Sequence, residues 1–216
     1  MKALVVRQPW ASLIAHGIKT IETRGFAPRT VLQPGDQLAI VAGKVKPSAV
    51  HERHWYGIDD PTPAVIEADE SPWVWTDWDD QTGGTWRWWS GPLGAVVAVV
   101  TFDRALPMEE CPPYSSSFDD RWEPEPPSVL YLGGLDGGPW AFIDGDGPIR
   151  FVDEAPLGDF TPGRYGWLLS NPHRLTSPVP CPAKRPDGSR TVMQGVFTLP
   201  DDVLADVQSQ LAAPAL

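Results

Sequence analysis

Three ionisable residues near the start of the chain have the types and the spacing of a ligand site. Lys19, Glu22 and Arg24 lie in the segment Lys-Thr-Ile-Glu-Thr-Arg. Two cations can hold a phosphate while a carboxylate accepts hydrogen bonds from the N–H groups of a nucleobase. The same pair can move protons, with Lys19 as general base or electrostatic stabiliser and Glu22 as its acid–base partner. The segment therefore indicates either a binding site or a catalytic site.

A β-strand over residues 19–24 would position these side chains. Alternation puts Glu22 and Arg24 on one face, about 7 Å apart, which allows a charge-assisted pair or a shared ligand. Lys19 would project to the opposite face unless an irregularity re-aims it, and Gly17 favours such an irregularity. The alternative is that Glu22 and Arg24 form a structural ion pair with no ligand.

Three candidates lie in neighbouring segments. Trp10 can stack on a base, or it can be a core residue that packs a helix onto the sheet. Gln8 can read a base edge, or it can cap backbone groups at the entrance to that helix. Lys44 follows the end of a predicted strand, where it could join Lys19 and Arg24 around a phosphate.

The hydrophobic pattern predicts an α+β, mainly β fold with peripheral helices. Strands are expected at residues 3–7, 19–24, 37–42, 94–102, 140–151, 165–169 and 191–199. Helices are expected at residues 9–16, 47–57 and 201–211. Many short strands without regular strand–helix alternation are typical of a small, partly closed β-barrel.

Two long segments interrupt this pattern, and we expect them to be insertions in a single domain over 1–216. The first, residues 59–92, contains six tryptophans, and the second covers residues 107–160 with a long loop at 107–139. A Gly-Gly turn signal lies between two pairs of alternate tryptophans, Trp73 and Trp75 before it and Trp86 and Trp88 after it. This pattern predicts a Trp-lined hairpin. This hairpin could cover the barrel, act as a lid or offer a surface to a partner.

Charge is divided unevenly along the chain. The net charge is −11, but residues 1–54 contain eight basic and three acidic residues, so their net charge is +5. Polyanion binding is therefore expected to be confined to this first quarter. No apolar stretch is long enough to cross a bilayer, so we expect a cytoplasmic protein that does not bind a membrane.

Metal and cofactor chemistry is not expected. Cys111 and Cys181 are the only cysteines, which is too few for a cysteine-based zinc site and gives little reason for a disulfide. His51 and His54 lie three positions apart, but no third ligand is evident near them.

Five blocks of the chain together resemble the ASCH domain, a member of the PUA-like superfamily of small β-barrels. They are RQPWASLIAHGIKTIETR, VAGK, GAVVAVVTF, YGWLLSNPHRL and QGVFTLP. The resemblance implies a cleft that Tyr165 helps to line, and binding of RNA or of modified bases. Some members are similar to amidohydrolases that use a lysine, a threonine three residues later and a distant glutamate. Lys19 matches that lysine, but Glu22 takes the place of the threonine nucleophile, which favours binding.

We therefore expect a domain that binds RNA, another single-stranded nucleic acid or a modified nucleotide. The expected ligand-binding residues are Gln8, Trp10, Lys19, Glu22, Arg24, Lys44 and Tyr165. The alternative is a metal-independent hydrolase that acts on RNA or on acylated nucleosides through Lys19 and Glu22. A third possibility is a protein-interaction module that works through the tryptophans. The sequence leaves the oligomeric state open, with a monomer as the default.

Overall fold

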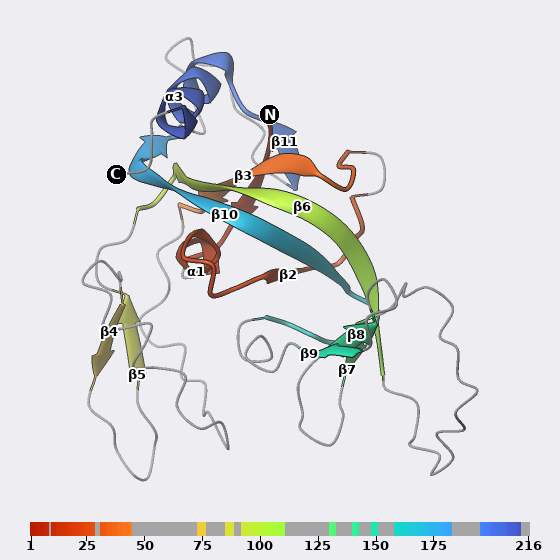
Figure 1. Cartoon of the computed structure of the whole chain (residues 1–216). Helices are drawn as coiled ribbons and strands as arrows, with labels where there is room; N and C mark the ends of the chain where they lie inside the picture. The colour runs from red at the N-terminus through yellow and green to blue at the C-terminus, as the bar shows by residue number, and fades with distance from the viewer. Residues whose placement is uncertain are drawn as a thin grey trace, which may run out of the picture. The chain divides into compact units, whose positions relative to one another are not determined.

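The described part of the chain is mainly β, as expected, and contains two helices. The computed structural model describes residues 1–8, 10–28, 31–44, 73–76, 85–88, 92–110, 130–132, 140–142, 148–150, 158–182 and 195–212. The elements, shown in Figure 1, are β1 (Lys2–Val6), α1 (Trp10–Ala15), β2 (Ile21–Arg24), β3 (Asp36–Ala42), β4 (Trp73–Thr76), β5 (Thr85–Trp88), β6 (Ala95–Glu110), β7 (Leu130–Leu132), β8 (Trp140–Phe142), β9 (Pro148–Arg150), β10 (Tyr165–Pro180), β11 (Val196–Thr198) and α3 (Asp201–Leu211). Neither helix in this part has the length and apolar character needed to cross a membrane.

The chain divides into two compact units. The first unit comprises Met1–Ile18, Gly35–Thr101 and Ser170–Leu216, and the second comprises Lys19–Pro34 and Phe102–Leu169. The long strands β6 and β10 each contribute residues to both units.

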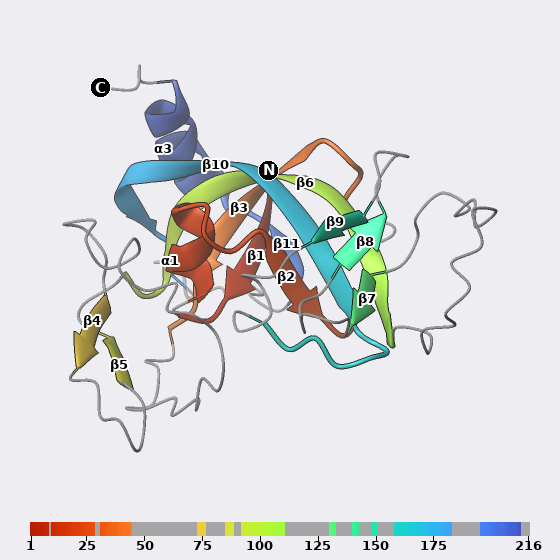
Figure 2. The ribbon, with the colours of Figure 1, turned by 60° about the horizontal axis from the view of Figure 1, so that its bottom comes forward.

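In the first unit, a parallel strand pair determines the path of the chain. β1 pairs in parallel with β3, from Lys2 opposite Leu38 to Val6 opposite Ala42, and it pairs antiparallel with β11 on its other edge. Parallel neighbours need a crossover between them, and α1 lies in this one. Figure 2 shows α1 alongside β1, and the helix contacts both β1 and β3.

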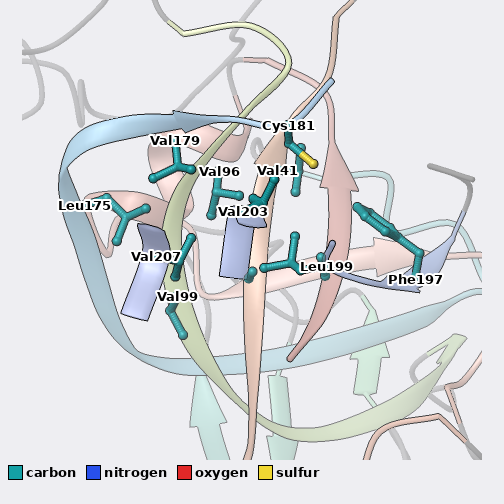
Figure 3. Close-up of a cluster of buried hydrophobic side chains, with 12 residues drawn as sticks. Val41, Val96, Val99, Leu175, Val179, Cys181, Phe197, Leu199, Val203 and Val207 are labelled. Carbon is teal, nitrogen blue, oxygen red and sulfur yellow. The ribbon is translucent and has the colours of Figure 1, made fainter. Parts of the chain in front are cut away.

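The core of the first unit is mainly aliphatic and includes one face of the C-terminal helix. Val203 and Val207, one turn apart on α3, are buried against side chains from β3, β6 and β10 (Figure 3). Pro200 stands directly before this helix, where proline does not interrupt helical hydrogen bonds. The bounds of α3 agree with the predicted helix at residues 201–211.

In the second unit, β2 pairs antiparallel with the first residues of β10. Arg24 lies opposite Tyr165 and Glu22 lies opposite Trp167. Among the described residues of this unit, a small core is formed by Ile21, Leu106, Met108 and Leu168, with Phe160 packed against it. β7 pairs in parallel with the end of β6, and β8 and β9 follow antiparallel.

Several predicted bounds are wrong. β6 continues past residue 102 to Glu110, through Pro107, and β10 continues past residue 169 to Pro180. The predicted loop at 107–139 therefore begins within a strand and contains β7. β2 begins at Ile21 and not at Lys19. The predicted helix at 47–57 lies outside the described residues.

The predicted tryptophan hairpin is confirmed at the level of its strands. β4 and β5 pair antiparallel, with Trp73 opposite Trp88 and Trp75 opposite Trp86. All four positions therefore share one face of the two-stranded sheet. The segment that joins the strands lies outside the described residues.

Candidate functional site

The site is built on the segment that leads from α1 into β2. Gly17 has φ +74°, a conformation that residues with a Cβ rarely adopt, and it ends the turn after α1. The chain then runs through Lys19 and Thr20 before β2 begins. The carbonyl of Thr20 accepts a hydrogen bond from the backbone N–H of Leu169, which fixes this entry segment on β10.

Lys19 is buried and turned toward Glu22. Its ammonium donates a hydrogen bond to the backbone carbonyl of Ile21, and Nζ lies 3.7 Å from Oε2 of Glu22. Only 1% of the Lys19 side-chain surface is exposed. A regular strand from residue 19 would have sent Lys19 to the opposite face. Because the strand begins two residues later, the side chain reaches the carboxylate.

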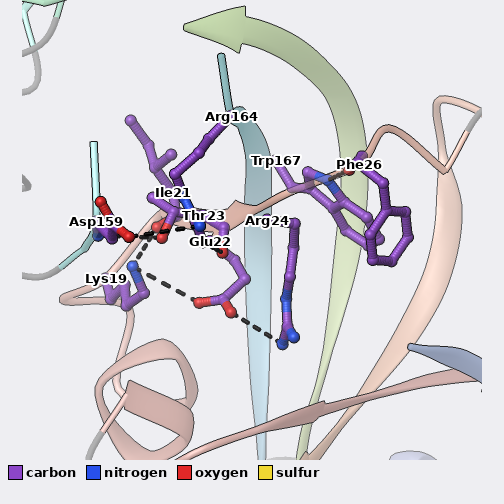
Figure 4. A network of polar contacts seen from close by, with 9 residues as sticks. All are labelled: Lys19, Ile21, Glu22, Thr23, Arg24, Phe26, Asp159, Arg164 and Trp167. Atoms are coloured by element: carbon purple, nitrogen blue, oxygen red, sulfur yellow. Dashed lines mark hydrogen bonds and ion pairs between the residues drawn. The ribbon is translucent and has the colours of Figure 1, made fainter. Parts of the chain in front are cut away.

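Glu22 is held between two cations. Its Oε1 lies 2.9 Å from Nη2 of Arg24, on the other side of the carboxylate from Lys19 (Figure 4). The side chain of Glu22 is 9% exposed and that of Arg24 is 23% exposed. The predicted Glu22–Arg24 pair on one face is thus present. The site has two positive charges and one negative charge, and Arg24 is the member that solvent reaches most.

A second polar cluster lies in the same unit and was missed by the sequence analysis. Arg164 lies 3.4 Å from the carboxylate of Asp159, and its Nη2 donates to the backbone carbonyl of Thr23. The backbone N–H of Asp159 donates to the hydroxyl of Thr23. About 140 positions separate Thr23 from these partners, so no local spacing could have indicated the contact.

Tyr165 and Trp167 occupy alternate positions on the strand that pairs with β2. Tyr165 is half-buried and lies opposite Arg24. Trp167 is fully buried, and its indole N–H donates to the backbone carbonyl of Phe26 at 3.0 Å. Trp167 is therefore a core residue that holds the segment directly after β2.

The other three predicted ligand contacts, Gln8, Trp10 and Lys44, belong to the first unit. Gln8 is almost fully buried, its Nε2 donates to the carbonyl of Pro92, and its Oε1 accepts from the backbone N–H of Ser12. These bonds cap backbone groups. Trp10 is half-buried at the start of α1, and Lys44 is exposed after β3.

The stem of Lys44 lies against a glycine in this first unit. A Cβ built on Gly94 would be 2.8 Å from Cε of Lys44, and Gly94 has φ +64°. The backbone carbonyl of Gly94 accepts from the N–H of Cys181, which is a buried free thiol. The pKa of this thiol is raised, mainly because burial disfavours the charged thiolate. The charge of Lys44 lowers the pKa, and the charge of Asp202 raises it.

No cluster of three or more His, Cys, Asp or Glu side chains that could hold a metal ion occurs among the described residues. His51 and His54 lie outside them. What the site offers is a partly exposed guanidinium, fixed on a buried carboxylate that a buried lysine also contacts. Comparison with protein-family models and with curated proteins finds no match for this chain.

Proposed function

We propose that the chain is an ASCH-like member of the PUA-like superfamily that binds single-stranded RNA or a nucleotide through Arg24 and Glu22. The observation that carries the proposal is the carboxylate of Glu22, held between Lys19 and Arg24. The guanidinium of Arg24 is partly exposed, and a guanidinium suits recognition of a phosphate or a base edge because its N–H donors lie in one plane. The mainly β architecture and the resemblance of residues 7–24 to the ASCH domain support the same proposal.

The distribution of charge also supports a small ligand. Residues 55–216 contain nine basic and 25 acidic residues, a net charge of −16, which repels an extended polyanion. Contact is therefore limited to a few nucleotides near Arg24. In this arrangement Lys19 is a positioning residue, because its ammonium contacts Glu22 and the backbone and is withdrawn from solvent.

The test is a titration of fluorescently labelled short RNA and of single nucleotides with the parent and its variants. We expect Arg24→Ala to weaken binding about tenfold or more, because it removes a charge-assisted contact. Lys19→Ala should also weaken binding by releasing Glu22. Arg174→Ala removes the same charge from an exposed position in the other unit, so it measures the non-specific electrostatic effect. If Lys19→Ala and Arg24→Ala both bind as the parent does, the proposal is wrong.

The second candidate is a metal-independent hydrolase, favoured by the contact between the buried ammonium of Lys19 and Glu22. A buried lysine that contacts a carboxylate can exchange protons with it. The protein would be incubated with RNA and with acylated cytidine in the presence of a chelator. Product that forms with the parent and disappears with Glu22→Gln, under conditions in which circular dichroism shows the variant to be folded, would identify an enzyme that uses Glu22. No product with the parent excludes these two substrates.

A further inference from the structure

Phe26 is unusual because it is a large apolar side chain that remains exposed only two positions after Arg24. Among the described residues, Phe26 and Val31 are the exposed large hydrophobic side chains, at 44% and 40%. Single exposed apolar residues are common and need no explanation by themselves. Phe26 is distinguished from Val31 by the way in which the fold holds it.

A fully buried tryptophan fixes Phe26 in place. The indole of Trp167 donates to the Phe26 carbonyl at 3.0 Å, and the two rings meet edge to face, with centroids 5.5 Å apart. Trp167 in turn packs edge to face against Phe102, whose ring centroid lies 5.8 Å away. An aromatic ring that is already ordered loses little conformational freedom when a ligand packs on it.

Phe26 also lies next to the groups that we propose to bind a nucleotide. It follows Arg24 by two positions, and Figure 4 shows Glu22, Arg24 and Phe26 extending to the same side of the segment. Trp167, which supports Phe26, lies opposite Glu22 in the β2–β10 register. The carboxylate and the guanidinium thus lie on β2, and the aromatic ring of Phe26 follows in the segment directly after this strand.

We infer that Phe26 is a stacking surface for one unpaired nucleobase, while Arg24 contacts its edge or the adjacent phosphate. This inference rests on the proposed function. Stacking needs a free face of the base, so the site should select single-stranded over duplex RNA. Trp167 acts through Phe26 and is a positioning residue.

The experiment compares two ligands, a short single-stranded RNA and the same backbone with abasic residues. With the parent, we expect the base-bearing RNA to bind more tightly. Phe26→Leu keeps an apolar side chain but removes the ring, so it should weaken binding of the base-bearing RNA about tenfold and leave the abasic backbone unchanged. Phe26→Tyr should retain binding. Val31→Ala is the matched control, an equally exposed apolar residue five positions along the chain.

The outcomes separate this inference from the proposed function. If the parent binds neither ligand, both are wrong. If Arg24→Ala weakens binding of both ligands but Phe26→Leu binds as the parent does, only the stacking role is wrong. If Phe26→Leu and Val31→Ala weaken binding equally, the surface is a general apolar contact, which also overturns the inference. Circular dichroism checks that each variant is folded.

Discussion

Nζ of Lys19 lies 3.7 Å from Oε2 of Glu22, in a part of the chain that is not helical. The contact exists because β2 begins at Ile21, so that the two preceding residues turn the lysine toward the carboxylate. A buried charge without a partner costs several kcal/mol, whereas a paired one costs far less. We therefore expect substitutions at Lys19, Glu22 and Arg24 to have coupled effects on stability as well as on binding.

Removing the shared carboxylate should destabilise the protein strongly. Glu22→Gln removes the carboxylate charge that both Lys19 and Arg24 contact, while the ammonium of Lys19 stays buried. We expect a loss of about 3–5 kcal/mol in the free energy of unfolding. Urea denaturation followed by circular dichroism measures it.

The control for this variant is another carboxylate in the same unit. Asp159 pairs with Arg164, but its side chain is 53% exposed, so Asp159→Asn should cost about 1 kcal/mol or less. A cost for Glu22→Gln no larger than that for Asp159→Asn contradicts the burial argument.

Removing both buried charges should restore part of the lost stability. Lys19→Met keeps the length of the side chain and removes its charge. The double variant Lys19→Met/Glu22→Gln removes both charges of the Lys19–Glu22 contact. The double variant should therefore be more stable than the sum of the single effects predicts, by about 1 kcal/mol or more, in a double-mutant cycle. Additive effects would show that the two residues do not interact.

The sequence predicted this site in part. Alternation along residues 22–24 correctly placed Glu22 and Arg24 on one face, because that rule depends only on the backbone of the strand itself. It placed Lys19 on the opposite face unless an irregularity re-aimed it, and it could not decide between these two because where the strand begins depends on the pairing with β10, whose paired residues are 165–168. Arg164 was missed for the same reason.

The fold, too, was predicted correctly where neighbouring residues determine an element and incorrectly where pairing with distant residues determines it. The helix at Asp201–Leu211 has local signals, a preceding proline and buried valines one turn apart, and its bounds were predicted correctly. β6 and β10 were predicted too short. A proline such as Pro107 predicts the end of a strand when only neighbouring residues are considered. The pairing that continues the strand past it involves residues elsewhere in the chain.

The thiol of Cys181 should react slowly in the folded protein. Burial raises its pKa, so little thiolate is present at neutral pH, and the thiolate is the reactive form. In a Cys111→Ser variant, alkylation followed by mass spectrometry should be much slower without urea than with it. Equal rates would show that the thiol is accessible.

The same thiol should make stability depend on pH in alkaline solution. In the unfolded chain it ionises at about pH 8.5, whereas in the folded protein its pKa is raised. The contribution of the protonated thiol to the free energy of unfolding is therefore fully present below about pH 8.5. It is lost as the pH rises from there through the pKa of the folded protein. Cys181→Ala, in the Cys111→Ser background, should show a smaller alkaline loss of stability. An identical pH profile for the two proteins would contradict the raised pKa.

The register of the β4–β5 hairpin can be tested by cross-linking. Val74 lies opposite Arg87, and the Cβ atoms of opposed residues are about 4.5–5.5 Å apart, close to the spacing that a disulfide needs. In a background without Cys111 and Cys181, the variant Val74→Cys/Arg87→Cys should form a disulfide under mild oxidation, detected by intact mass after free thiols are trapped. Val74→Cys/Trp86→Cys is the control, because residue 86 opposes residue 75 and belongs to the other face. If only the control pair cross-links, the strands are shifted by one residue, and the four tryptophans cannot share a face.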